Sequence, residues 1–257
     1  MAEKLKYLFL IFVIILTLNC GISAIENDNP PEVFRTANNL YEKADFHGAI
    51  EKYQSLAEGG IRDKSIYYNL GNAYYKTNKI GLAVLNYKKA HKLSPRDKDI
   101  TANLAFMRER VVDQIKYEKN LPQIIWENTI SILTANEWVI LCTILYLIFM
   151  SLLIICVLKK DISDEIKFYK NMTFIIFCFV LIFSISSYIA GRQMEAVITS
   201  DEVDVRNGPG ENYSKGFILH EGTEVFVEND SGGWLEIILP NGLKGWIEKN
   251  NIQFTKD

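Results

Sequence analysis

Two long apolar runs dominate the pattern of hydrophobic and polar positions along this chain of 257 residues. Residues 138–158 and 172–190 contain no Asp, Glu, Lys, Arg or His. A helix of about 20 apolar residues is long enough to cross the hydrocarbon core of a membrane. Two consecutive crossings return the chain to the side that it left. The pattern therefore predicts a two-helix transmembrane hairpin, closed by a loop at residues 159–171, whose flanking segments share one compartment.

The distribution of basic residues predicts which compartment that is. The loop at residues 159–171 carries four lysines, whereas residues 120–137 contain no Lys or Arg. Lys and Arg in short loops favour the cytoplasmic side of a membrane. We therefore expect a cytoplasmic loop, with both flanking segments on the outer side. Trp126, Trp138 and Tyr188 stand where aromatic residues gather at membrane surfaces.

The N-terminus independently predicts export. Two lysines precede an apolar core at residues 7–18, which is the pattern of an export signal over residues 1–24. The chain after it would then lie on the outer side. Three outcomes remain open: cleavage after Ala24, lipidation of Cys20, or an anchor that is not cleaved.

Residues 30–118 contain a repeat of 34 residues with helical spacing. The central copy resembles the tetratricopeptide repeat, in which small residues let two antiparallel helices approach closely and aromatic residues fill the space around them. A weaker copy precedes it, and only a first helix, at about residues 98–116, follows it as a cap. We expect an all-α tetratricopeptide solenoid. The matching positions are Tyr67, Leu70, Gly71, Tyr74, Ala83, Tyr87 and Pro95.

Asparagines recur at the same period. Asn38 and Asn72 are 34 residues apart, as are Asn69 and Asn103. An Asn side chain offers both a donor and an acceptor, so a row of them on the concave face would bond the backbone of an extended peptide. The alternative is that all four are solvated helix residues.

The segment at residues 121–137 is apolar, with few charges. It would either lie along the membrane surface or form a helix that packs under the repeats. Thr134 and Glu137 have the Thr-x-x-Glu spacing of a helix start, directly before the first span.

From residue 195 to residue 257 the pattern alternates and predicts an all-β small barrel. The order of its glycines and tryptophans resembles the bacterial SH3-like domain. Trp234 and Trp246 would line a ligand groove, or else serve as core and edge packing. The expected strands are residues 203–206, 216–219, 222–227, 234–237 and 244–247.

Composition and motifs argue against an enzyme. The net charge of −3 offers no basic face for nucleic acid, and three of the four cysteines lie inside the predicted spans. His47, His91 and His220 lack the spacing of metal ligands. We expect no catalytic residues, no metal and no cofactor. A cell-wall hydrolase, a third class of function, would need a nucleophile or metal set.

The order of signal, short repeats, hairpin and barrel resembles the E component of the Bat aerotolerance proteins. This resemblance implies a multi-pass protein of the bacterial inner membrane, with repeats and barrel on the periplasmic side. It also implies von Willebrand A-type membrane proteins and a MoxR-type ATPase as partners. We expect a scaffold or adaptor with two protein-binding modules, linked to oxidative stress. The alternative is a tether or sensor that binds peptidoglycan through the barrel.

Overall fold

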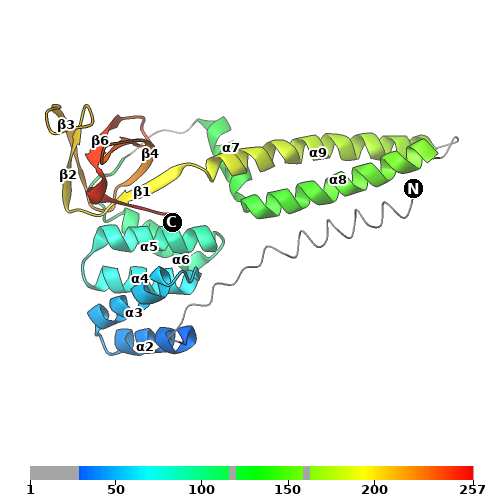
Figure 1. Cartoon of the computed structure of the whole chain (residues 1–257). Coiled ribbons are helices and arrows are strands. Elements are labelled where there is room, and N and C mark those ends of the chain that lie inside the picture. The colour runs from blue at the N-terminus through cyan, green and yellow to red at the C-terminus, as the bar shows by residue number, and fades with distance from the viewer. Residues whose placement is uncertain (1–28, 116–119, 159–162, 257) are drawn as a thin grey trace.

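The computed structural model describes residues 29–115, 120–158 and 163–256. It confirms the predicted fold class: a stack of antiparallel helices, a long two-helix hairpin and a small antiparallel barrel (Figure 1). The predicted export signal at residues 1–24, with Cys20, lies outside the described residues. The repeat helices are α2 (Pro30–Glu42), α3 (Phe46–Glu58), α4 (Lys64–Lys76), α5 (Ile80–Leu93) and α6 (Lys98–Arg108).

Small residues set the distance between the repeat helices, as the sequence predicts. A methyl group added at Gly71 on α4 would lie 3.0 Å from the ring of Tyr87 on α5. Ala83 on α5 and Ala49 on α3 are fully buried. Because protein cores are close-packed, no larger side chain fits at these positions without moving a helix.

The turns inside each helix pair also repeat. Ala44 and Asn78 both adopt left-handed backbone conformations, with φ of 61° and 58°. Asn tolerates this region, whereas Ala is strained there by about 1 kcal/mol. We expect Ala44→Asn to raise the unfolding free energy of the full-length chain in detergent by about 0.5–1 kcal/mol. Asn78→Ala should lower it by a similar amount, and no change in either melting temperature would contradict this account.

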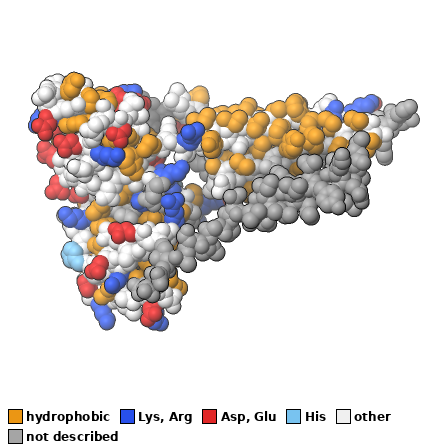
Figure 2. Space-filling view, viewed as in Figure 1, with side chains coloured by type: hydrophobic (Ala, Val, Ile, Leu, Met, Phe, Trp, Pro, Cys, Tyr) orange, Lys and Arg blue, Asp and Glu red, His pale blue; other side chains and the backbone are white. Residues whose placement is uncertain are grey.

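The hairpin consists of α8 (Ala135–Leu158) and α9 (Asp164–Ala190), both long and apolar enough to cross a membrane. Their apolar side chains face outward along most of the length (Figure 2). Helix α9 begins earlier than predicted, so residues 164–171 are helical rather than loop. Asp164 and Glu165 explain this start, because acidic side chains in a first turn interact favourably with the helix dipole.

The predicted helix-start signal at Thr134 and Glu137 is confirmed, and α8 begins at Ala135, three residues before the predicted span. The Thr134 N–H donates to the carboxylate of Glu137 at 2.8 Å, and the Glu137 N–H donates to the Thr134 hydroxyl at 3.3 Å. Arg96, in the turn after α5, donates to the same carboxylate at 2.7 and 3.1 Å and to the Ile132 carbonyl at 2.8 Å. These hydrogen bonds therefore hold the turn after α5 against the start of α8.

Helix α7 (Leu121–Ser131) packs on α9 at the soluble end of the hairpin. The ring of Phe183 lies 5.0 Å from that of Trp126 and 5.5 Å from that of Trp138. The indole N–H of Trp138 donates to the Ile130 carbonyl at 3.0 Å. The segment therefore contacts mainly the hairpin helix α9. Packing under the repeats, one of the two arrangements predicted for it, is not its main arrangement.

The barrel has seven strands, two more than predicted. Its order is β3-β2-β6-β5-β4-β1-β7, with antiparallel pairing. The five predicted strands are present, and the added strands are β1 and β7, which pair with each other. The strands are β1 (Met194–Ile198), β2 (Glu202–Arg206), β3 (Lys215–His220), β4 (Glu224–Ser231), β5 (Trp234–Ile238), β6 (Lys244–Glu248) and β7 (Ile252–Phe254).

Strand β1 is buried on both faces and joins the barrel to the repeats. Ala196 and Ile198 belong to the barrel core, whereas Val197 between them packs in the core of the repeat helices. A methyl group at Gly81 on α5 would lie 2.6 Å from the Ile198 carbonyl oxygen, so α5 and β1 meet backbone to backbone. The Gly81 N–H donates to the carboxylate of Glu221 at 2.9 Å.

Ion pairs surround this repeat–barrel interface. Glu224 on β4 accepts from Arg108 at 2.6 and 3.0 Å and from Lys88 at 2.5 Å. Glu195 on β1 lies 2.8 Å from Lys92 and 3.7 Å from Lys88. The Lys88 side chain is only 10% exposed. Its buried charge therefore depends on these two carboxylates.

A polar cluster closes the other side of the interface. Asp113, beyond α6, accepts from the His220 N–H and from the Thr223 hydroxyl, both at 2.6 Å. The other oxygen of Asp113 lies 2.9 Å from the His220 ring nitrogen Nδ1. Val111 covers Gly222, where φ is 87° and an added methyl group would lie 2.7 Å from Val111. Repeats and barrel form one continuous body.

This interface should weaken in acid. Burial raises the pKa of Glu224, but the hydrogen bond from Arg108 and the charge of Lys88 outweigh burial and hold the pKa at about 2, below the usual 4.5. A carboxylate with a lowered pKa stabilises the folded state above pH 4.5, and this contribution is lost as the pH falls toward 2. Through Glu224 alone, we expect a loss of about 3 kcal/mol of unfolding free energy over that range.

Thermal unfolding of the full-length protein in detergent between about pH 5 and pH 2 measures this loss. Other carboxylates also titrate there, so the quantity to compare is the difference between the wild type and Glu224→Gln. The variant should show the weaker dependence on pH. Parallel curves for the two proteins would rule out the ion pair as the cause.

Candidate functional site

The concave face of the repeat stack is formed by α2, α4 and α6. Two hollows of about 180 and 270 Å³ open along it, and Asn69 lines both. Within the described part of the chain, no residue of the barrel or the hairpin lines either hollow. The first is lined by Asn38, Tyr41, Glu42, Tyr53 and Asn69; the second by Lys64, Ser65, Tyr68, Asn69, Asp97, Asp99 and Ile100.

Of the four predicted asparagines, Asn38 and Asn69 line these hollows, and each of the four is bonded inside the stack. The oxygen of Asn38 accepts from the Tyr53 hydroxyl at 2.6 Å and from the amide of Asn69 at 3.2 Å. The oxygen of Asn72 accepts from the Tyr87 hydroxyl at 2.6 Å. Burial raises the pKa of Tyr53 to about 12, which keeps its hydroxyl a donor. The repeat of Asn38 and Asn72 thus reflects a bond from a tyrosine hydroxyl on the second helix of each pair.

The second hollow is bordered by an asparagine–tyrosine hydrogen bond and by charged side chains. The amide of Asn103 on α6 donates to the Tyr68 hydroxyl on α4 at 2.9 Å. Lys64 and Asp97 form an ion pair at 2.7 Å, and Asp99 lies beside them. The groove therefore carries both signs of charge, and its polar groups are spaced along three helices.

Sequence reasoning missed the aromatic residues of the groove. Tyr75 on α4 and Phe106 on α6 lie with ring centroids 5.8 Å apart, and the guanidinium carbon of Arg110 lies 3.4 Å from the Phe106 ring centroid. Tyr41 and Tyr68 line the two hollows. The 34-residue repeat could have indicated two of these aromatic residues, because Tyr41 and Tyr75 are 34 residues apart.

The two predicted tryptophans share the outer face of the barrel. Arg206 on β2 lies opposite Trp246 on β6, and Trp246 lies opposite Glu236 on β5. The Arg206 guanidinium is 6.0 Å from the ring centroid of Trp234. Both tryptophans are half-buried. In the sheet order β4 lies between this face and β1, so the two tryptophans lie apart from the groove.

Comparison with known families matches two parts of the chain. Residues 65–97 match the tetratricopeptide repeat, and residues 201–253 match the bacterial SH3 domain. The chain carries both modules. The first match spans α4 and α5, and the second begins just before β2. Strand β1, which joins the two modules, lies outside both matches.

Among curated proteins, the chain is similar to the putative N-acetylmuramoyl-L-alanine amidase YrvJ of Bacillus subtilis (strain 168). The two are 37% identical over 81 residues, which is 32% of this chain and 15% of the relative. The chain thus spans less than a fifth of that relative's length, and the similarity is one of a module.

Proposed function

We propose that the chain is a non-enzymatic membrane adaptor whose tetratricopeptide groove holds an extended segment of a protein partner. The observation that carries this proposal is the open concave face. The SH3 domain docks on α5, the second helix of its pair, and leaves the hollows on α2, α4 and α6 uncovered. Amides and aromatic rings beside each other suit a peptide, because amides bond its backbone and rings cover its apolar side chains.

The proposed orientation places both soluble modules on the outer side of the membrane. Lys167 and Lys170 lie near the start of α9, at the end of the hairpin away from the modules. Basic residues favour the cytoplasmic side, so that end is assigned to the cytoplasm. The bacterial SH3 domain on the other end supports the same assignment. In a Gram-negative cell this is the periplasmic face of the inner membrane.

We further propose that the adaptor works in a Bat-type envelope complex linked to aerotolerance. The module order in the sequence supports this assignment, with von Willebrand A-type membrane proteins and a MoxR-type ATPase as expected partners. Co-purification from mild detergent tests it. Recovery of the chain without either class of protein would remove the Bat assignment and leave the adaptor proposal standing.

Site-specific photocrosslinking in cells tests the groove itself. Glu42 and Asp99 are exposed and line the two hollows, so a photoreactive amino acid at either position should capture the partner. Glu51, exposed on α3, is the matched control on the outer surface of the stack. Equal capture from Glu51 and the groove positions, or capture from none of them, would contradict the proposal.

A second candidate function is a tether that binds peptidoglycan through the SH3 domain. Two observations favour it: the outward face of Trp234, Trp246 and Arg206, and the similarity to a relative named for N-acetylmuramoyl-L-alanine, a unit of peptidoglycan. Aromatic faces are suited to stacking on sugars and peptides. Sedimentation of the detergent-solubilised full-length chain with purified peptidoglycan discriminates the two. Retention that Trp246→Ala abolishes would select the tether; no retention would remove it.

A further inference from the structure

Helix α7 has two apolar faces, and within the described part of the chain the hairpin covers one of them. Ile130, and Leu133 just after the helix, pack against the cluster of Trp138, Val180 and Phe183. The other face carries apolar side chains at a helical period, which brings them together on one side. They are Leu121, Ile124, Ile125 and Ile132, with exposed fractions of 74%, 38%, 65% and 60%.

Helix α7 lies at a level of the hairpin that belongs to the predicted membrane span. The ring of Trp126 on α7 lies 5.0 Å from that of Phe183. Phe183 lies inside the apolar run 172–190, roughly 10 Å along α9 from Ala190 at 1.5 Å per residue. A run of this length needs nearly all of its residues to cross the hydrocarbon core, so the level of Phe183 is within the bilayer. Figure 1 shows α7 beside the soluble end of the hairpin.

The exposed face of α7 adjoins other exposed apolar surface of the hairpin. Val139 and Ile140, at the start of α8, are exposed, as is Ile189 near the end of α9. A bilayer that covers these side chains reaches α7 as well, because α7 is in contact with both helices. Its Ile130 carbonyl accepts from the indole N–H of Trp138 on α8, and its other contact is with α9.

We propose that α7 inserts its exposed apolar face into the adjoining leaflet, at the boundary between headgroups and acyl chains. The proposal rests on the membrane placement of the hairpin proposed above. Amphipathic helices at this boundary are buried by about 5–10 Å. Residues 120–137 contain no Lys or Arg, so insertion depends on apolar contact and not on the charge of the headgroups.

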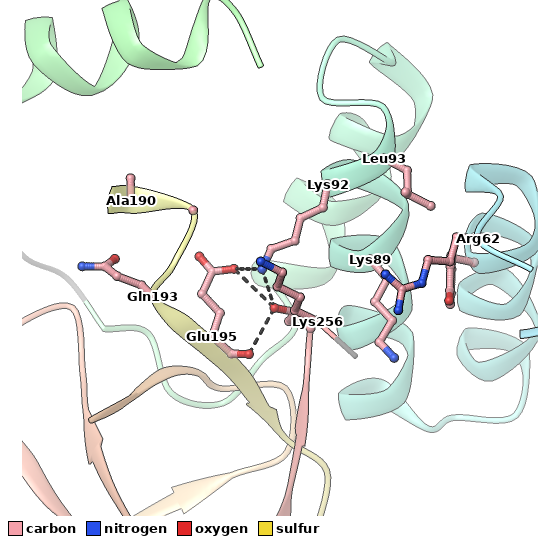
Figure 3. Close-up of a pocket in the computed structure, with 11 residues that line it drawn as sticks. Arg62, Lys89, Lys92, Leu93, Ala190, Gln193, Glu195 and Lys256 are labelled. Atoms are coloured by element: carbon pink, nitrogen blue, oxygen red, sulfur yellow. Dashed lines mark hydrogen bonds and ion pairs between the residues drawn. The ribbon is translucent and has the colours of Figure 1, made fainter. Parts of the chain in front are cut away.

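The inserted helix holds the soluble body in one orientation over the membrane, because the body is bonded to the hairpin side at two points. Arg96, in the turn after α5, donates to the Ile132 carbonyl at 2.8 Å. At the second point α9 leads into β1, and Lys92 on α5 lies 2.8 Å from Glu195 on β1 (Figure 3). The groove of the repeats therefore stays at a fixed height above the leaflet.

Electron paramagnetic resonance of the full-length chain in lipid nanodiscs tests this proposal. A nitroxide label is attached to one cysteine at a time, in a chain whose four native cysteines are replaced by Ala. Oxygen concentrates in lipid and a nickel chelate stays in water, so the label at Ile125→Cys should collide with oxygen, at a depth of about 5–10 Å. Ile148→Cys, exposed in the middle of α8, is the control for the hydrocarbon core, and Glu51→Cys on α3 is the control for water.

The two controls separate the insertion of α7 from the placement of the hairpin. If the Ile125 label meets nickel as readily as the Glu51 label while the Ile148 label is deep, α7 is not inserted and the hairpin placement stands. Nickel contact at Ile148 would overturn the hairpin placement itself. An immobile Ile125 label that neither reagent reaches would show that protein covers this face, and would overturn the assignment to lipid.

Two matched double variants test which side chains hold the helix in the leaflet, and the melting temperature of each shows that it is folded. Leu121→Asn with Ile132→Asn should return the Ile125 label to nickel contact, because much of the exposed face is then polar. Ile218→Asn with Leu243→Asn removes two exposed apolar side chains of the barrel and should leave the depth unchanged. Equal depth in both variants would overturn the role of this face.

The lipid composition of the nanodiscs supplies the last comparison. The depth of the Ile125 label should be the same in phosphatidylcholine alone and in a mixture with phosphatidylglycerol, because the face of α7 is uncharged. Insertion that requires phosphatidylglycerol would show electrostatic attraction of the soluble body and overturn the apolar mechanism.

Discussion

Glu224→Gln is expected to lower the melting temperature of the full-length protein in detergent by about 5–10 °C. The substitution removes the charge that Lys88 and Arg108 share at the repeat–barrel interface. Lys88 is almost fully buried, so its ammonium is left without its nearest carboxylate, and Glu195 at 3.7 Å compensates only in part. Removing one member of a buried ion pair costs about 3–5 kcal/mol; partial exposure of Arg108 lowers the value here to about 2–3 kcal/mol.

Glu228→Gln is the matched control, because Glu228 lies on the same strand and pairs with Lys244 at 2.5 Å on the surface. Surface ion pairs contribute little, so this variant should melt within a degree or two of the wild type. Limited proteolysis adds a second readout: Glu224→Gln should expose the segment around Asp113 to cleavage. If both variants melt alike, the interface does not depend on the buried charge.

Phe106→Ala is expected to weaken partner retention by at least ~10-fold, because exposed aromatic residues in a groove contribute most of the energy of peptide binding. Phe106 is 40% exposed and is held by Tyr75 on one side and Arg110 on the other. Its truncation should leave the melting temperature nearly unchanged, since the ring is not part of the core. Quantitative co-purification from cells that express the full-length variant measures the loss.

Leu93→Ala is the control for this experiment, because Leu93 is similarly exposed, at 45%, and lies at the end of α5 outside the groove. It should retain the partner. Trp246→Ala completes the set: loss of the partner in this variant with full retention in Phe106→Ala would move the binding site from the groove to the SH3 domain.

Local patterns were sufficient for most of the elements and for the order of the modules. Apolar runs of membrane length, the 34-residue repeat and the alternating segments each depend on neighbours within one helix pair or hairpin. The Thr134–Glu137 start signal and the close approach at Gly71 were readable for the same reason. The bonds of the predicted asparagines to tyrosines were not predicted, because such bonds join different helices.

The strand that joins the modules escaped prediction for a physical reason. In β1 the residues Ala196, Val197 and Ile198 are all buried, so the alternation that marks a half-exposed strand is absent. Its outward residue, Val197, is covered by α5 rather than by water. Strand β7 has only three residues, too few for any pattern.

The sequence by itself determined the repeat helices, the apolar hairpin and the alternating strands. It also predicted that both soluble modules lie at the same end of the hairpin. Only the tertiary structure decided that the modules form one body, that the groove stays open while α5 is covered, and that one apolar face of α7 is left uncovered by the rest of the described chain. The periodicity of a segment indicates which face of that helix or strand is apolar. Which surface covers each face, and which distant charges then meet, depends on packing between segments as far apart as Lys88 and Glu224.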